Sequence, residues 1–387
     1  MRIYLDNAAT TPLSLEVFEA MQPYFFENFG NPSSSHYYGR SAKTAIDKSR
    51  TTIADLLNTS PEHIIFTSGG TEADNTAILS AIRGNGIKLA VTTAFEHHAV
   101  LNTLKLLQRN GEIRLIYLNH DERGNLSIPH LEEILATGEK AFVSVMHGNN
   151  EIGNINDIHE IAEVCRKYSA VFHSDTVQSM GQYAFDTKVL QADFLVGSAH
   201  KFHGPKGIGF LYKSIKTSIT PFINGGSQER SQRSGTENVT GIVGLAKALE
   251  LAYSNRENYQ THISNLKQHM IAQLLRKIPG IRFNGNSAIK ELSLSTVLSV
   301  ALPETLSGQP PLTYLDQHNI CASGGSACTS HSTAGSHVLG ALGNNYDGST
   351  IRFSFSRYNT KQEIDFTVDQ LASLFIKDVL NEMRATG

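Results

Sequence analysis

A lysine beside a buried-looking strand is the strongest sign of chemistry in this sequence. Lys201 follows the apolar segment 193–198 and precedes the glycine-rich turn 204–209, which matches neither common nucleotide-binding glycine pattern. An ammonium group in such a place is costly unless it is paired or neutralised. A Schiff base with a carbonyl cofactor removes the free amine, and glycines let a bulky group approach the backbone. On its own, a solvated loop lysine would be the commoner case.

Three further segments carry polar groups at the ends of apolar runs. Gly70-Thr71 follows the run 63–67 and opens a helix, where free N–H groups and a hydroxyl suit a phosphate, although a simple N-cap is the alternative. Asp175 ends another run, at the sheet edge where α/β proteins bind ligands, although a lone Asp is more often a cap. Arg352 lies in a strand-like segment, and its planar fork suits a substrate carboxylate.

The chain has three cysteines, Cys165, Cys321 and Cys328. This count excludes a disulfide scaffold and a four-cysteine zinc site, and it suits a reducing compartment. Cys165 lies in a helical pattern and Cys321 ends an apolar run, so both are predicted to be inert structural residues. Cys328 follows a Gly-Gly-Ser segment, which is a poor environment for a packing residue. It is the candidate reactive thiol.

These motifs together resemble the cysteine desulfurases of the NifS/IscS type, class V aminotransferases with the fold-type I pyridoxal-phosphate (PLP) architecture. The resemblance runs from Tyr4-Leu-Asp-Asn-Ala-Ala-Thr-Thr-Pro12 to Ile351-Arg-Phe-Ser-Phe-Ser-Arg357. It implies a PLP-dependent sulfurtransferase that takes sulfur from L-cysteine, releases L-alanine and leaves a persulfide on Cys328. The persulfide would pass to an acceptor such as an iron–sulfur scaffold or a thio-modification protein.

The resemblance also implies a role for each site residue. Lys201 would carry PLP and remove the substrate Cα proton, His97 would stack on the ring and relay protons, and Cys328 would be the nucleophile. Arg352, with Asn150, would bind the substrate. The cofactor-binding positions are Gly70, Thr71, His97, Asn150, Asp175, Gln178, Ser198, His200, Lys201 and Thr236.

The resemblance places Thr236 on a segment, beginning at Arg233, that reaches a neighbouring subunit's phosphate, so it implies a homodimer. His98 is expected at the surface and Arg357 in a structural role. No metal is expected beyond transient iron–sulfur contact through Cys328, because the adjacent or closely spaced histidine pairs 97/98 and 200/203 lack a third ligand.

Two departures from the family pattern concern the acceptor side of the reaction. Residues 329–337 lack the usual Glu-Pro, and residues 303–311 lack the usual acidic helix start. A selenocysteine lyase would use the same site. A PLP-dependent aminotransferase or β-lyase would not need Cys328, and a silent PLP-fold sulfur-relay scaffold would not need Lys201 chemistry.

The elements that must position these residues follow from composition and periodicity. The chain has 387 residues, 40% of them hydrophobic, with a net charge of −3 and no basic stripe. No apolar run approaches the roughly 18 residues of a membrane span, and no secretory signal is visible. We therefore expect a cytoplasmic protein that binds neither nucleic acid nor membranes.

Apolar runs rich in β-branched residues alternate with helical patterns through the first two thirds of the chain. This order predicts an α/β fold with a mostly parallel sheet covered on both faces, seven-stranded in the fold-type I family. The rhythm changes after residue 240, where long helical stripes flank three strand-like segments. We expect a large PLP-binding domain over 16–256 and a small α+β domain over 257–387, joined by the N-terminal segment 1–15. The predicted strands are 63–67, 88–93, 113–118, 141–147, 170–174, 193–198, 208–212, 281–285, 295–302 and 350–356.

Overall fold

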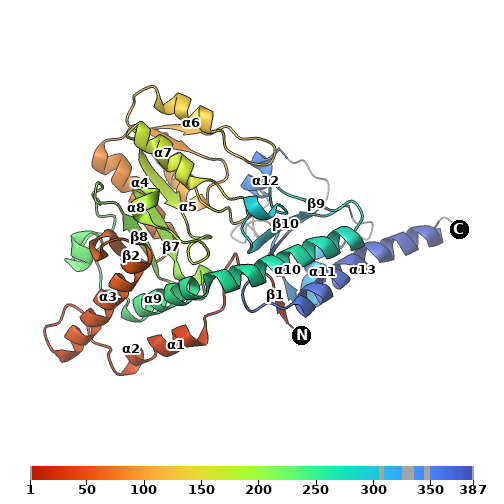
Figure 1. The fold of residues 1–387 in the computed structure, drawn as a ribbon, viewed down its shortest axis with the longest axis horizontal. Coiled ribbons are helices and arrows are strands. Elements are labelled where there is room, and N and C mark those ends of the chain that lie inside the picture. Colours follow the sequence, from red (N-terminus) through yellow and green to blue (C-terminus); the bar gives the residue numbers. More distant parts are fainter. Residues whose placement is uncertain (1, 305–308, 325–334, 344–348, 386–387) are drawn as a thin grey trace.

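The structure is a computed structural model that describes residues 2–304, 309–324, 335–343 and 349–385. Cys328, the predicted nucleophile, lies outside the described residues. Two groups of elements lie side by side in Figure 1, a sheet with helices on both faces and a smaller group around two long helices.

A seven-stranded sheet forms the larger group, as predicted. Its strand order is β2-β8-β7-β6-β5-β3-β4, and all neighbouring pairs are parallel except those of β8, which runs antiparallel to β2 and β7. The strands are β2 (Ile64–Thr67), β3 (Leu89–Thr92), β4 (Arg114–Tyr117), β5 (Ala141–Ser144), β6 (Val171–Asp175), β7 (Phe194–Ser198) and β8 (Gly209–Lys213).

Successive side chains of these strands enter opposite faces of the sheet. In β2, Ile64 and Phe66 pack into one apolar core, whereas Ile65 packs into another. Both faces are therefore covered, which explains why the strand sequences are continuously apolar rather than alternating. The first face is covered by α1 (Leu15–Met21), α3 (Tyr37–Leu56), α6 (Ile128–Leu135), α7 (Ile158–Lys167) and α9 (Val239–Ser254). The second is covered by α4 (Gly70–Leu79) and α5 (His98–Arg109).

The smaller group has its own apolar core, built on a three-stranded antiparallel sheet in the order β12-β10-β9. The N-terminal strand joins it from the far end of the chain, since β1 pairs in parallel with β11. The division into two domains at residue 257 stays a prediction. The elements are β1 (Ile3–Tyr4), β9 (Arg282–Phe283), β10 (Val297–Ala301), β11 (Ile320–Cys321), β12 (Thr350–Ser354), α10 (Arg256–Lys277), α11 (Pro311–Gln317), α12 (His337–Ala341) and α13 (Lys361–Ala385).

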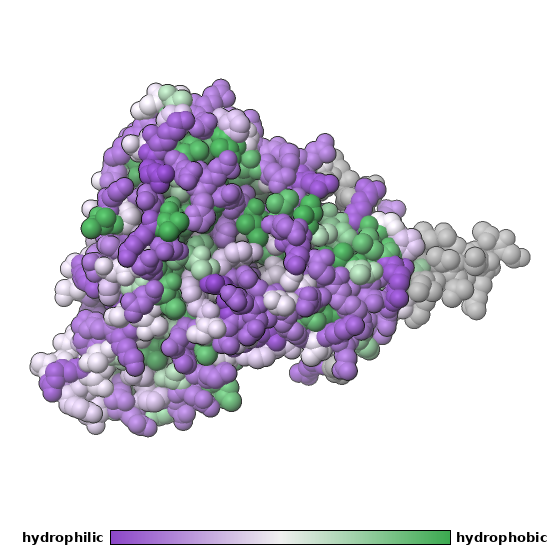
Figure 2. Space-filling view, in the orientation of Figure 1, coloured by the Kyte–Doolittle hydropathy of each residue, from purple (hydrophilic) through white to green (hydrophobic). Residues whose placement is uncertain are grey.

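Two short helices complete the described α-helices, α2 (Pro23–Phe26) and α8 (Thr187–Leu190). None of the helices in the described ranges is both long and apolar enough to cross a membrane. On the face shown in Figure 2, hydrophobic residues are scattered among hydrophilic ones rather than joined in a band.

One prediction about the cysteines is wrong. Cys165 is buried in α7 as expected, and burial raises the pKa of its thiol. Cys321, predicted to be an inert core residue, is exposed. Side chains alternate along β11, so Ile320 takes the core position and Cys321 faces outward.

Candidate active site

The predicted site residues converge on one cavity of about 250 Å³. It lies where β6 and β7 end and α4 begins, the edge at which open α/β sheets bind ligands. Every predicted cofactor and substrate residue within the described ranges lines it except Thr236. A larger cavity of about 740 Å³ lies at the opposite edge of the sheet, and no predicted site residue lines that one. The lining residues are Ala8, Ala9, Gly70, Thr71, Asp74, His97, Met146, Asn150, Asp175, Val177, Gln178, Ser198, His200, Lys201 and Arg352.

Lys201 enters this cavity from a single turn of 3₁₀ helix that directly follows β7. Its Nζ donates hydrogen bonds to the carbonyl oxygens of Ala8 (2.6 Å) and Ala9 (2.9 Å). Gln178 Nε2 donates to the same Ala8 carbonyl at 3.0 Å. The N-terminal segment therefore forms one wall of the cavity, a contribution that the sequence motifs alone did not assign to it.

The N-terminus of α4 forms an anion-binding surface beside Lys201. Gly70 and Thr71 begin the helix, so their backbone N–H groups have no partner within it. A Cβ at Gly70 would lie 2.8 Å from Val177 Cγ2, so a larger residue here would have to displace the Val177 side chain. Ser198 and His200 lie across the opening, in a recess of about 450 Å³ that Lys206 also lines. Burial, with Lys201 and Lys206 nearby, lowers the pKa of His200 to about 4, so its ring is neutral at pH 7.

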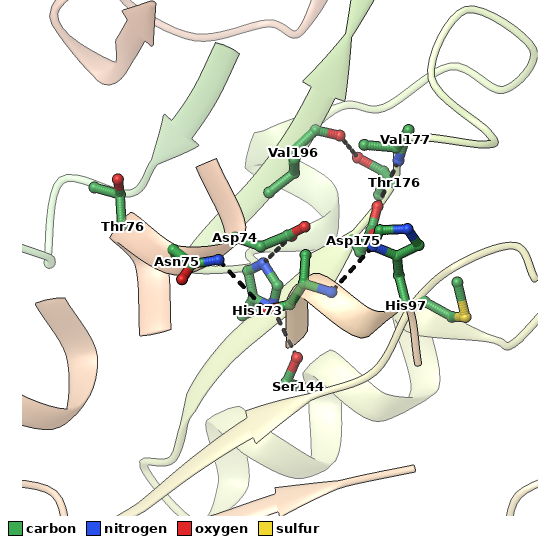
Figure 3. A network of polar contacts seen from close by, with 12 residues as sticks. Asp74, Asn75, Thr76, His97, Ser144, His173, Asp175, Thr176, Val177 and Val196 are labelled. Atoms are coloured by element: carbon green, nitrogen blue, oxygen red, sulfur yellow. Dashed lines mark hydrogen bonds and ion pairs between the residues drawn. The ribbon is translucent and has the colours of Figure 1, made fainter. Parts of the chain in front are cut away.

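Asp175 lies at the deep end of the cavity, at the last position of β6. It is buried, and one carboxylate oxygen accepts from the Val177 N–H at 2.9 Å. Burial raises its pKa, while His97, the Val177 N–H and Lys201 act in the opposite direction. His97 caps α5, since its Nδ1 accepts from the Ala99 N–H at 3.1 Å. Figure 3 shows His97 and Asp175 side by side.

Arg352 closes the site from β12, across the boundary between the two groups of elements. It is 1% exposed, and its Nη1 donates to the Asn150 carbonyl at 2.8 Å. Its Nη2 forms an ion pair with Asp6 Oδ1 at 2.8 Å. A substrate carboxylate at Arg352 would therefore share the guanidinium with Asp6. Arg357, three residues past β12's Ser354, instead packs over the rings of Tyr259 and Tyr358.

The histidines at 97 and 98 are adjacent in the sequence, and their ring centroids lie 6.3 Å apart. The expectation that this pair holds no metal stays a prediction. His98 is half-buried, and its ring packs 4.4 Å from that of His337. Within the described ranges, the one group of three side chains close enough to hold a metal is Asp74, His97 and Asp175, with donor atoms within 4.8 Å of one another.

Thr236 lies apart from the cavity of its own chain and is exposed. The segment that carries it is held at the rim by Arg233, whose Nε pairs with Glu72 Oε1 at 2.9 Å on α4. Its predicted contact with a neighbouring subunit's phosphate stays a prediction.

The chemistry of the donor set fits PLP. An amine, a helix N-terminus with hydroxyl and imidazole groups beside it, and a buried carboxylate under an imidazole are arranged in one cavity. These groups match the aldehyde, the phosphate and the pyridine nitrogen of PLP.

Comparison with known proteins gives the family. The Aminotransferase class-V family model matches residues 3–366. This chain belongs to the class-V aminotransferase family. It is 40% identical over 380 residues to the cysteine desulfurase IscS of Dictyoglomus turgidum, covering 97% of this chain and 95% of that one.

Solved structures show that this class-V aminotransferase shares its fold with NifS-like proteins. A NifS-like protein superimposes with a TM-score of 0.88 at 34% identity, covering 96% of this chain and 99% of the other. SspA, solved in complex with cysteine, has a TM-score of 0.80 at 31% identity, covering 93% of this chain and 100% of the other. The expected fold-type I architecture is therefore confirmed.

Proposed function

We propose that this protein is a PLP-dependent cysteine desulfurase that converts L-cysteine to L-alanine and a persulfide on Cys328. The observation that carries the proposal is the convergence of Lys201, Asp175, His97 and Arg352 on one cavity of a chain related to cysteine desulfurases along nearly its whole length. This sulfurtransferase activity is also the expectation drawn from the sequence.

In this proposal Gly70, Thr71, Ser198 and His200 hold the PLP phosphate, and Lys201 binds its aldehyde carbon. When bound, PLP supplies an electron sink for the pair released at the substrate Cα. Asp175 keeps a negative charge at the ring nitrogen, and His97 covers the ring. These assignments rest on where the side chains lie in the cavity and on the resemblance.

The substrate L-cysteine is oriented by two groups on opposite walls. Arg352 binds its carboxylate, and the Asn150 carbonyl and Asp6 fix the guanidinium in the plane that this requires. Once the substrate amine has replaced Lys201 at the aldehyde carbon, the freed Nζ of Lys201 would remove the Cα proton as a general base. The hydrogen bonds to the Ala8 and Ala9 carbonyls hold the Lys201 Nζ at the wall formed by the N-terminal segment.

Sulfur transfer then belongs to Cys328. Its thiolate attacks the substrate Sγ, so an S–S bond forms on the enzyme while the substrate C–S bond breaks and the electron pair stays with the substrate carbon. Protonation of that carbon and return of a proton to Cα give alanine. The persulfide sulfur leaves to an acceptor thiol, for which an iron–sulfur scaffold or a thio-modification protein is the class we propose. The reaction is proposed to take place in the cytoplasm.

The active unit is proposed to be a homodimer in which Thr236 reaches the partner's phosphate site. Thr236 is exposed in the single chain, and a cluster of exposed aromatic residues lies on α1, α2 and the start of α3. Exposed apolar clusters of this kind mark interfaces. Light scattering should give twice the chain mass, and Phe26→Asp should shift it toward the monomer. The cluster is Phe18, Phe25, Phe26, Phe29, Tyr37 and Tyr38.

Product analysis tests the proposed function. Purified protein with PLP should release alanine from L-cysteine, with sulfide in the presence of a thiol reductant. Cys328→Ser should lose both products, while Cys321→Ser, the matched exposed thiol, should keep them. Pyruvate in place of alanine would indicate a β-lyase, and wild-type rates in Cys328→Ser would contradict the persulfide mechanism.

A further inference from the structure

A second buried carboxyl group lies beneath Asp175, and neither the sequence motifs nor the proposed mechanism gives it a task. Asp74 is 1% exposed and lies on the first turns of α4, at the edge of the same cavity. Its donor atom lies within 4.8 Å of those of Asp175 and His97. Two carboxylates this close, both removed from water, are not stable as two anions.

Among the described residues, the basic-type side chain that pairs with Asp74, apart from the nearby His97, is His173, and it is neutral. Asp74 Oδ1 lies 3.3 Å from His173 Nε2, as Figure 3 shows, and both residues are fully enclosed. Burial lowers the pKa of His173 to about 3, and its other nitrogen, Nδ1, bonds to Ser144 Oγ at 2.8 Å. His173 therefore brings no positive charge that would stabilise an ionised Asp74.

The other carboxyl groups near Asp74 also favour its protonated form. Glu96 is fully buried near His97, where its Oε1 accepts from the Met146 N–H at 2.7 Å, and burial raises its pKa to about 8. Burial, with Asp175 and Glu96 adding to it, raises the pKa of Asp74 well above its ordinary value. The neighbouring strands β2 and β7 carry no titratable side chain. Arg83, which follows α4, pairs with Glu112. The titratable groups on the other elements packed against α4 are His98, Lys105 and Arg109 of α5 and Tyr212 and Lys213 of β8.

We propose that Asp74 is a positioning residue that stays protonated, so that Asp175 carries the only negative charge of the pair. The inference rests on the proposed function, because only a ring-nitrogen partner needs a single, fixed charge. As a neutral acid Asp74 can share a hydrogen bond with His173, and the two join α4 to β6. Gly70 lies one turn before Asp74 on α4, and Asp175 two residues after His173 on β6, so this contact fixes the phosphate-binding surface relative to the ring-nitrogen partner.

Infrared spectroscopy of the full chain before PLP is added tests the proton directly. A protonated carboxyl group has a C=O stretching band that a carboxylate lacks. At pH 7 the wild type should show this band, and Asp74→Asn should reduce it. Glu96→Gln is the matched control, because it changes another buried carboxyl to an amide; Asp74→Asn and Glu96→Gln should remove different components. If Asp74→Asn leaves the band unchanged, Asp74 is ionised and the proposal is wrong.

The pH dependence of unfolding gives a second readout that a steric role would not move. Unfolded Asp74 ionises near pH 4, whereas the folded residue keeps its proton, so rising pH favours unfolding of the wild type. The ratio of unfolding constants, Asp74→Asn over wild type, should fall by up to about tenfold per pH unit above pH 4. A ratio that is constant between pH 5 and 8 would overturn the proposal.

Two further measurements keep the proposal separate from the proposed function. If Asp74→Asn does not fold, Asp175→Asn can be measured instead. This variant removes the negative charge beside Asp74, so the infrared C=O band of Asp74 should disappear at a lower pH than in the wild type. An unshifted titration of that band would contradict the coupling between Asp74 and Asp175. In PLP titrations followed by absorbance, Asp175→Asn should weaken binding at least about tenfold more than Asp74→Asn, since only Asp175 loses a charge-assisted bond. Equal losses would contradict the assignment of charge, whereas failure of the wild type to bind PLP would contradict the proposed function alone.

Discussion

Replacement of Arg352 by lysine tests whether this residue binds the substrate carboxylate or only supports the surrounding structure. The guanidinium is 1% exposed and already donates to Asn150 and Asp6 at 2.8 Å each, so it can present a fixed edge to a carboxylate. Lysine keeps the charge but loses the planar fork and so cannot serve all three partners. Hydrogen bonds to charged groups contribute about 1.5–3 kcal/mol each. Loss of two such bonds to the substrate, at about 1.5–2 kcal/mol each, would cost about 3–4 kcal/mol of transition-state stabilisation and so lower kcat/KM for L-cysteine roughly 100- to 1,000-fold.

The assay is steady-state alanine formation, combined with a PLP titration and a thermal unfolding curve. Two variants control for structural effects. Asp6→Asn removes the ion pair but leaves the guanidinium for the substrate, and Arg357→Lys changes a nearby arginine that lies outside the cavity lining. The reasoning would be refuted if Asp6→Asn reproduced the full loss of Arg352→Lys, because Arg352 would then act only as a support. It would also be refuted if Arg352→Lys left kcat/KM unchanged.

Four further predictions follow from groups elsewhere in the chain. Arg50→Ala should destabilise the protein by about 3–5 kcal/mol in chemical denaturation, since it leaves Glu229 buried without its ion-pair partner; a loss below about 1 kcal/mol would contradict this. Asp175→Asn should lower kcat/KM at least about 100-fold, and an active variant would contradict the ring-nitrogen assignment. Burial lowers the pKa of Lys267 to about 7, so wild-type stability should rise between pH 7 and about 10.5, by up to about 5 kcal/mol. Lys267→Met should lack this rise, and parallel stability curves for the two proteins would contradict the prediction. Cys321→Ser should keep the wild-type rate of alanine formation, and a large loss would show that sulfur passes through this exposed thiol.

Much of the large sheet was predictable because its strands are buried on both faces and therefore read as continuous apolar runs. The run 141–147 was too long, since β5 ends at Ser144 and Met146 already lines the cavity. Helix α9 carried no such signal. It is buried around much of its circumference and includes Gly241 and Gly244, so it has no clear apolar stripe.

The presence of Lys201 and Asp175 in one cavity could be anticipated from the sequence, because each lies at or just after the end of a buried strand of the same sheet. The missing parts depend on contacts between distant segments. The wall formed by Ala8 and Ala9 exists only because the N-terminal segment lies beside Lys201, which follows β7. Its contacts are made by backbone carbonyls, which every residue has, so the residue types do not reveal them. The contact between Asp74 and His173 forms only when α4 packs on β6. The contact proposed for Thr236 would require a second chain.

The most direct test of the central claim is to locate the cofactor chemically and ask whether L-cysteine displaces it. The full chain is loaded with PLP, reduced with borohydride and analysed by peptide mass spectrometry, with and without prior L-cysteine. The account predicts a pyridoxyl group on Lys201 alone, and reduced labelling of Lys201 after L-cysteine but not after D-cysteine. A label on another lysine, or labelling of Lys201 that L-cysteine does not change, would contradict it.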